Sequence, residues 1–170
     1  MLPALGNGHL EYEYAPRIAR DPSTGVLLVT WDTFNAGVGG HGARAWRSTN
    51  NGVNWNLVLS TSDDTAHTTV AFSPDGFELG LTYIDVFTPS NNGAQVSWRS
   101  PAASDGSSWD SGYFISSFRS FTPINIGSRP CFWGDYDGLS YNPPSFAFMH
   151  SWYDSTQGPR SVIRGRFADF

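Results

Sequence analysis

The amino-acid sequence contains an internal repeat with a period of 52 residues. The phrase Trp-Arg-Ser begins at Trp46 and occurs again 52 residues later, at Trp98. The pairs Thr30-Trp31 and Thr82-Tyr83 are separated by the same interval. A period shared by two separate segments indicates that one structural unit occurs at least twice, as it does in propellers and solenoids.

Each unit is predicted to be a meander of short strands. Apolar residues alternate or form short blocks between clusters of Gly, Pro, Asn, Asp and Ser, and helical periodicity is nearly absent. The aromatic share of 15% suits side chains that pack on pleated surfaces. A third, more divergent unit follows a long connection over residues 111–134 and supplies three predicted strands in place of four.

These patterns predict an all-β fold of four-stranded antiparallel propeller blades, three per chain. Residues 1–170 form a single module, with blades at about 15–60, 66–117 and 132–170. A two-sheet sandwich is the alternative, since it also has short strands at even spacing.

The turn after the first Trp-Arg-Ser phrase carries a specific spacing. Ser48, Asn50, Gly52 and Trp55 resemble the Asp-box of sialidase-like (BNR repeat) propellers, Ser-x-Asp-x-Gly-x-x-Trp, with Asn50 at the aspartate position. An amide oxygen can still accept hydrogen bonds within the turn, and Gly52 can supply a positive φ angle. The segment 16–31 also resembles a blade of this family.

The second copy of the turn matches less well. Gly106 and Trp109 keep the spacing, which places Ala102 at the serine position and Ser104 at the aspartate position. In the third unit, residues 132–143 resemble a segment of the last blade of such proteins. The resemblance implies a propeller blade more than it implies any particular chemistry, and it favours an extracellular location.

The resemblance implies a ligand site at one end of the blades. The Asp-box turns share an end with the turns between first and second strands, so ligands would bind at the opposite end, where loops vary most. We expect three in-phase aspartates there, each following a second strand, and further residues near first strands; the candidates are Asp32, Asp85, Asp154, Arg17, His67, Arg129, Asp135 and Tyr136.

The three aspartates allow more than one interpretation. They could orient sugar hydroxyls or, with a partner's residues, bind a cation through oxygen ligands. The simpler interpretation is that they accept hydrogen bonds from loop N–H groups, as aspartates at strand ends do.

Non-catalytic glycan recognition is the predicted function. Sialidases resembling this fold use an arginine cluster, a tyrosine nucleophile assisted by glutamate and an aspartate acid/base. The chain contains only Glu11, Glu13 and Glu78, and none occupies the expected position, so no catalytic set is assigned. A sialidase-type glycoside hydrolase, or a fragment of one, is one alternative, and a structural module that assembles through blade edges is another.

Charge and composition limit the classes of partner and cofactor that we expect. The net charge of −5 argues against nucleic acid. Cys131 is the only cysteine, and the four histidines lack ligand spacing, so we predict no intrachain disulfide, no metal and no cofactor. There is no apolar run of membrane-spanning length.

Three blades are too few to close a ring, because propellers contain about four to eight. We therefore expect two chains to form one six-bladed homodimeric ring. Residues 9–14 alternate between polar and apolar side chains and belong to no unit. They predict an additional strand that completes a blade of the partner by pairing with residues 161–167.

Overall fold

The computed structural model describes residues 16–35, 40–61, 65–87, 92–100, 105–116, 124–126, 129–132, 138–142, 147–154 and 162–168. These residues form strands and turns. No described segment is a helix that could span a membrane. The predicted strand at residues 9–14 lies outside the described residues, as do Asp135 and Tyr136.

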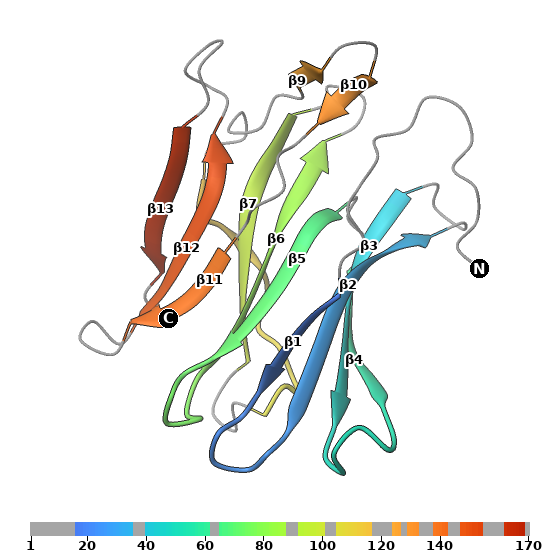
Figure 1. Ribbon diagram of the computed structural model, residues 1–170, viewed down its shortest axis with the longest axis vertical. Helices are drawn as coiled ribbons and strands as arrows, with labels where there is room; N and C mark the ends of the chain where they lie inside the picture. The colour runs from blue at the N-terminus through green and yellow to red at the C-terminus, as the bar shows by residue number, and fades with distance from the viewer. Residues whose placement is uncertain are drawn as a thin grey trace.

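Three antiparallel sheets lie side by side, and each sheet pairs its strands in chain order (Figure 1). Blade 1 consists of β1 (Arg17–Arg20), β2 (Leu27–Asn35), β3 (Gly40–Ser48) and β4 (Asn56–Ser60). Blade 2 consists of β5 (Thr65–Phe72), β6 (Leu79–Phe87), β7 (Asn92–Ser100) and β8 (Tyr113–Phe114). Blade 3 consists of β11 (Gly138–Asn142), β12 (Ala147–Asp154) and β13 (Val162–Ala168). The predicted antiparallel meanders are confirmed.

The 52-residue repeat is visible in the strand register. Leu27 of β2 lies opposite Ser48 of β3, and Leu79 of β6 lies opposite Ser100 of β7. Because side chains alternate between the two faces of a strand, residues 52 apart occupy the same face of their respective blades. We call the face turned toward the preceding blade the leading face, and the face turned toward the following blade the trailing face. The leading face of blade 1 is the face turned away from blade 2, and the trailing face of blade 3 is likewise the face turned away from blade 2.

The main core lies between the trailing face of blade 1 and the leading face of blade 2. Leu28, Ala43 and Ala45 of blade 1 form one buried cluster with Leu81 and Tyr83 of blade 2. Each large aliphatic side chain buried in this way contributes roughly 1.5–3 kcal/mol to folding. These buried apolar residues of β2, β3 and β6 therefore hold the two blades together.

A second interface joins blades 2 and 3. Phe148 of β12 packs on Gly80, where an added Cβ would lie 3.2 Å from the phenylalanine ring. The buried imidazole of His150 lies with Nε2 3.3 Å from Oγ of Ser97. Burial lowers the pKa of His150 to about 4. His150 is thus a neutral packing residue at neutral pH, which agrees with its place in an apolar strand.

The connection before blade 3 differs from the sequence prediction. It contains a two-stranded ribbon, β9 (Ile124–Ile126) and β10 (Arg129–Phe132), which was not predicted. In the sequence, the pair Gly127-Ser128 separates Ile126 from Arg129 with the spacing of a two-residue hairpin, and this signal could have revealed the ribbon. A register shift occurs between Arg129 and Phe132, beside Pro130, which lacks the N–H that a regular ladder needs.

Candidate functional site

The blades have two chemically distinct ends. In the view of Figure 1, the β1–β2, β3–β4 and β5–β6 turns lie at the lower end, and the second strands β2, β6 and β12 finish at the upper end. The ligand site predicted from the sequence corresponds to the upper end, and the Asp-box-like turn between β3 and β4 belongs to the lower end.

The turn between β3 and β4 is held by its own side chains. The hydroxyl of Ser48 accepts a hydrogen bond from the N–H of Gly52 (2.9 Å), and Oδ1 of Asn50 accepts one from the N–H of Asn54 (2.8 Å). The indole of Trp55 covers the turn and donates to the carbonyl of Gly52 (2.9 Å). The positive φ predicted for Gly52 is confirmed at 82°.

The second turn corrects one assignment made from the sequence. Gly106 has a φ of 72°, and its N–H donates to the hydroxyl of Ser100 (3.2 Å), so the serine equivalent to Ser48 is Ser100. Placing Ala102 at that position was wrong. The turn is two residues longer than the first, so the fixed motif spacing misaligned it, whereas the repeated Trp-Arg-Ser phrase aligns the two serines correctly.

The extra length of this turn brings Asp105 to the preceding blade. Its carboxylate pairs with the Arg47 guanidinium at 2.5 Å, and its carbonyl accepts from Nε of Arg47 at 2.6 Å. Burial by itself would raise the pKa of Asp105, but hydrogen bonds from Ser107 and the charge of Arg47 lower it. The lower end is therefore a structural joint between blades 1 and 2.

Asp32 anchors the upper end. Its carboxylate is buried and accepts hydrogen bonds from the hydroxyl of Thr65 (2.9 Å), the hydroxyl of Thr68 and the N–H of Thr68 (3.1 Å). Burial raises the pKa of Asp32 above its ordinary value, although these hydrogen bonds act in the opposite direction. Asp32 thus joins β2 of blade 1 to β5 of blade 2, which is the anchoring behaviour of the simpler interpretation.

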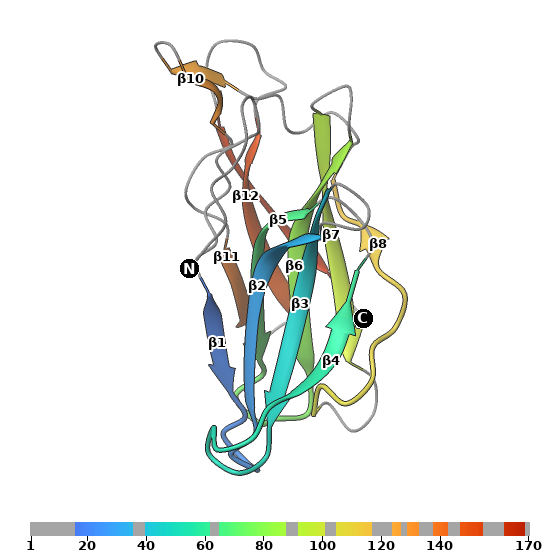
Figure 2. The ribbon, with the colours of Figure 1, turned by 90° about the vertical axis from the view of Figure 1, so that its right-hand side faces the viewer.

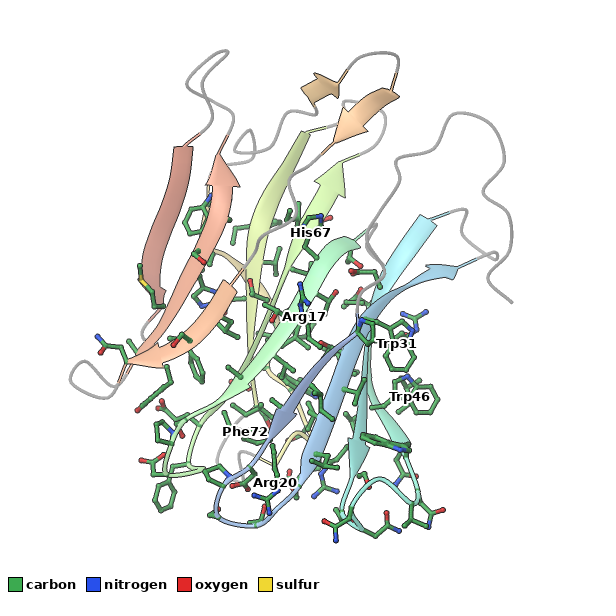
Figure 3. All side chains as sticks on the ribbon, viewed as in Figure 1. Arg17, Arg20, Trp31, Trp46, His67 and Phe72 are labelled. Carbon is green, nitrogen blue, oxygen red and sulfur yellow. The ribbon has the colours of Figure 1, made fainter. Side chains whose placement is uncertain are left out.

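The anchor holds an unusual backbone at His67. The β5–β6 register shifts between Ala66 and Thr69, and within this bulge His67 has a φ of 60°. Left-handed backbone is uncommon for a residue other than glycine and occurs frequently at functional sites. The half-buried His67 lies near the upper end of β5 (Figure 3).

Two more candidates border this bulge. Asp85, which is half-buried, lies opposite Thr65 in the β5–β6 ladder. Asp32 and Asp85 lie within β2 and β6 and are 53 residues apart, so the prediction of in-phase aspartates that each follow a second strand was wrong for these two. Arg17, which is exposed, begins β1 and lies opposite Thr30 of β2. Thr30 precedes Asp32 by two residues in the same strand. Figure 3 shows Arg17 between β1 and β5. The structure therefore brings Arg17, Asp32, His67 and Asp85 to one region of blades 1 and 2.

The remaining candidates cannot be grouped with this region by side-chain contacts. Asp154 ends β12 and Arg129 begins β10, and both strand ends lie at the upper end of the molecule (Figure 1). The membership of Arg129, Asp154, Asp135 and Tyr136 in a ligand site stays a prediction. In the part of the chain that the structure describes, no three His, Cys, Asp or Glu side chains gather as metal ligands would.

A second surface was not anticipated from the sequence. The rings of Trp31 and Trp46 stack with centroids 5.9 Å apart and planes 5° apart, on the side of blade 1 that faces away from blade 2 (Figure 3). With Val29 and Trp55 they line a depression of about 440 Å³. The repeat contained the signal for this surface, because Trp31 is equivalent to Tyr83, a core residue, and Trp46 is equivalent to Trp98, which packs against the core.

Comparison with known proteins shows the fold. An α-L-arabinanase of Penicillium chrysogenum, solved with arabinobiose, is similar with a TM-score of 0.62 and 17% identity, over 92% of this chain and 47% of that one. A GH93 α-L-arabinofuranosidase of Fusarium graminearum, also solved with arabinobiose, gives a TM-score of 0.52 and 14% identity, over 92% of this chain and 46% of that one. Both are β-propellers, so this chain has a propeller-like fold.

The chain spans about half the length of these similar structures. No protein-family model and no curated protein sequence matches it.

Proposed function

We propose that this chain is a sialidase-like, Asp-box propeller module that recognises a glycan at the upper end of its blades without hydrolysing it. The observation that carries the proposal is the bulge at His67. There a side chain able to donate and accept hydrogen bonds stands on left-handed backbone, and Asp32 holds that backbone in place. Such pre-organised strain is characteristic of ligand sites.

A saccharide is the proposed ligand class. Both similar structures were solved with arabinobiose, a disaccharide rich in hydroxyl groups. The exposed Arg17, the half-buried His67 and the half-buried Asp85 supply donors and acceptors suited to such hydroxyls. The Ser48–Trp55 turn supports membership in the Asp-box group, and that membership supports an extracellular location.

The buried state of Asp32 supports recognition over hydrolysis. A glycosidase of the usual kind needs two carboxyl groups that reach the glycosidic bond. Asp32 is 3% exposed, and its oxygens are occupied by Thr65 and Thr68. The alternative, favoured by the enzyme names of both similar structures, is that the chain forms half of a glycoside hydrolase of sialidase or arabinanase type.

Isothermal titration with arabino-oligosaccharides and with a sialylated trisaccharide tests the proposal. His67→Asn keeps a residue that tolerates left-handed backbone but removes the imidazole, and it should weaken binding at least tenfold. Phe77→Ser, which alters an exposed residue of the β5–β6 turn at the lower end, should leave binding unchanged. Equal affinity in both variants would contradict the proposed site.

The enzymatic alternative has a separate readout. Prolonged incubation of the chain with the same oligosaccharides should release no monosaccharide, as measured by anion-exchange chromatography. Release that disappears in the Asp85→Asn variant would replace recognition with catalysis.

The homodimeric six-bladed ring and the exchange of residues 9–14 belong to the same proposal. Deletion of residues 1–14 should then leave monomers or aggregates by light scattering. A truncated chain that remains a folded dimer would exclude the strand exchange.

A further inference from the structure

The leading face of blade 1 exposes large apolar side chains. Ile18, Val29, Trp46 and Leu57 lie opposite one another in a row across β1, β2, β3 and β4. Ile18 is 64% exposed and Leu57 is 47% exposed. We call these four residues, with Trp31 and Trp55, the tryptophan surface. Figure 2 is turned so that blade 1 and this face are toward the viewer.

The equivalent row in blade 2 is covered. Val70, Leu81 and Trp98 lie opposite one another across β5, β6 and β7, each 52 residues after its counterpart in blade 1. Val70 is 7% exposed and Leu81 is fully buried, because the trailing face of blade 1 packs on them. The tryptophan surface is therefore a blade-packing face that has no blade on it.

The trailing faces show what kind of surface covers such a row. At the centre of the trailing face of blade 1, Thr30 lies opposite Ala45, and at the centre of the trailing face of blade 2, Thr82 lies opposite Ser97. All four residues are fully buried. Small side chains on the trailing face thus leave room for the bulky leading face of the next blade, as close packing of a core requires.

Blade 3 offers the same kind of trailing surface. Ser151 of β12 lies opposite Gly138 of β11 and Gly165 of β13, so this row also has small residues at its centre. The neighbouring positions in β12, Phe148, His150 and Trp152, are buried toward blade 2, which places Ser151 on the trailing face. Gly165 is exposed and Ser151 is only half-buried.

We propose that the trailing face of blade 3 from a second copy of this chain covers the tryptophan surface, and that the second copy's tryptophan surface is covered reciprocally. Bulky residues on one face then meet small residues on the other, as they do between blades 1 and 2. Two contacts related by a two-fold axis close the assembly. The chain spans 47% and 46% of the two similar propellers, so two copies supply about the length of a whole ring.

This interface specifies how the proposed homodimer is built, and it rests on that part of the proposed function but not on glycan recognition. A sugar stacked on the tryptophans is the competing occupant. Sugar sites combine aromatic rings with placed polar groups. The depression is lined by Val29, Trp31, Trp46 and Trp55, all apolar except for the indole N–H groups, and this favours a protein face.

Sedimentation equilibrium of matched variants tests the interface. The unaltered chain should have twice the mass of one chain. Trp46→Arg and Gly165→Glu each place a charge in the interface and should each give monomers with unchanged circular dichroism spectra. Trp31→Tyr and Gly165→Ala copy the equivalent residues Tyr83 and Ala45, and both should remain dimers.

Mixing the two monomeric variants gives the decisive result. A Trp46→Arg chain retains an intact blade 3 face, and a Gly165→Glu chain retains an intact blade 1 face. Their mixture should regain the mass of a dimer, because one contact is restored and the other pairs arginine with glutamate. Titration of the monomeric Trp46→Arg variant with arabino-oligosaccharides reports on glycan recognition separately, since His67 is unaltered.

Three results would overturn the inference. One is a monomeric unaltered chain, and another is a Gly165→Glu variant that remains a dimer, since tryptophan surfaces would then pair with each other. The third is saccharide binding that Trp46→Arg abolishes while His67→Asn leaves it intact, which would make the tryptophan surface a sugar site. If either charged variant fails to fold, Trp31→Arg and Ser151→Glu replace it in the same mixing scheme.

Discussion

Gly106 offers the most quantitative test of how the blades pack. It combines a φ of 72° with a buried position in the turn after β7. An added Cβ would lie 2.5 Å from Cδ1 of Leu28 and 3.2 Å from Cδ2 of Leu79, both fully buried. The Gly106→Ala substitution therefore changes both the backbone energy and the packing between blades 1 and 2.

The two contributions can be separated with a control glycine. Left-handed backbone costs an alanine roughly 1–2 kcal/mol, and overpacking a core with one carbon costs roughly 1–3 kcal/mol. Gly25 has a similar φ of 76°, but a Cβ there would meet only the flexible end of Arg20, at 3.2 Å. Gly25→Ala should lower the free energy of unfolding by the backbone cost alone, and Gly106→Ala should lower it by about 1–3 kcal/mol more.

Urea denaturation followed by tryptophan fluorescence measures both free energies of unfolding. The free energy of unfolding should be highest for the unaltered chain, lower for Gly25→Ala and lowest for Gly106→Ala. If the two variants are equally stable, the β7–β8 turn does not pack on Leu28, and the blade 1–blade 2 interface described above is wrong in that region.

Three further substitutions test individual contacts by the same assay. Gly52→Val should cost more than ~1 kcal/mol because of the φ of 82° and the nearby Trp55 ring, whereas Val53→Ala, at a 77% exposed neighbour, should be nearly neutral; equal effects would contradict the turn. His150→Gln tests the pH dependence of stability that the buried histidine causes. Because the pKa of His150 is about 4 in the folded chain and 6.5 ordinarily, the unfolded chain binds a proton first as the pH falls from 6.5 toward 4. The unaltered protein should therefore lose about 2–3 kcal/mol of stability over this range, and the variant should lack this loss. An identical pH profile in both would mean that His150 is not buried as a neutral group. Asp32→Ala should cost about 1–3 kcal/mol, since the N–H of Thr68 and the hydroxyl of Thr65 would lose their buried acceptor; no loss of stability would show that the contact does not join the blades.

Local features of the fold could be predicted because short-range chemistry determines them. Gly52 must adopt positive φ in a tight turn whatever surrounds it, and the alternation of apolar residues in β2 and β6 indicates strands with two distinct faces. The 52-residue period then placed Trp46 and Trp98 at equivalent positions before any contact was known.

The candidate site was predictable only in part. The sequence placed Asp32, Asp85 and His67 at one end of the blades, since strand order determines the end. It did not indicate that the Asp32 carboxylate would accept hydrogen bonds from Thr65 and Thr68. Those hydrogen bonds depend on a bulge in β5, and the register of this bulge arises from packing between two sheets.

The repeat, the antiparallel meanders and the chemistry of the first turn follow from residue spacing within one unit, so the amino-acid sequence is enough to predict them. Which face of each blade is covered depends on how the blades pack. Trp31 and Tyr83 are equivalent in sequence, yet Tyr83 is 1% exposed, whereas Trp31 remains half-buried beside an open depression. Burial depends on a neighbouring surface, which the sequence of one blade does not specify. Blade 2 has blade 1 in front of it, and in this chain no described blade precedes blade 1.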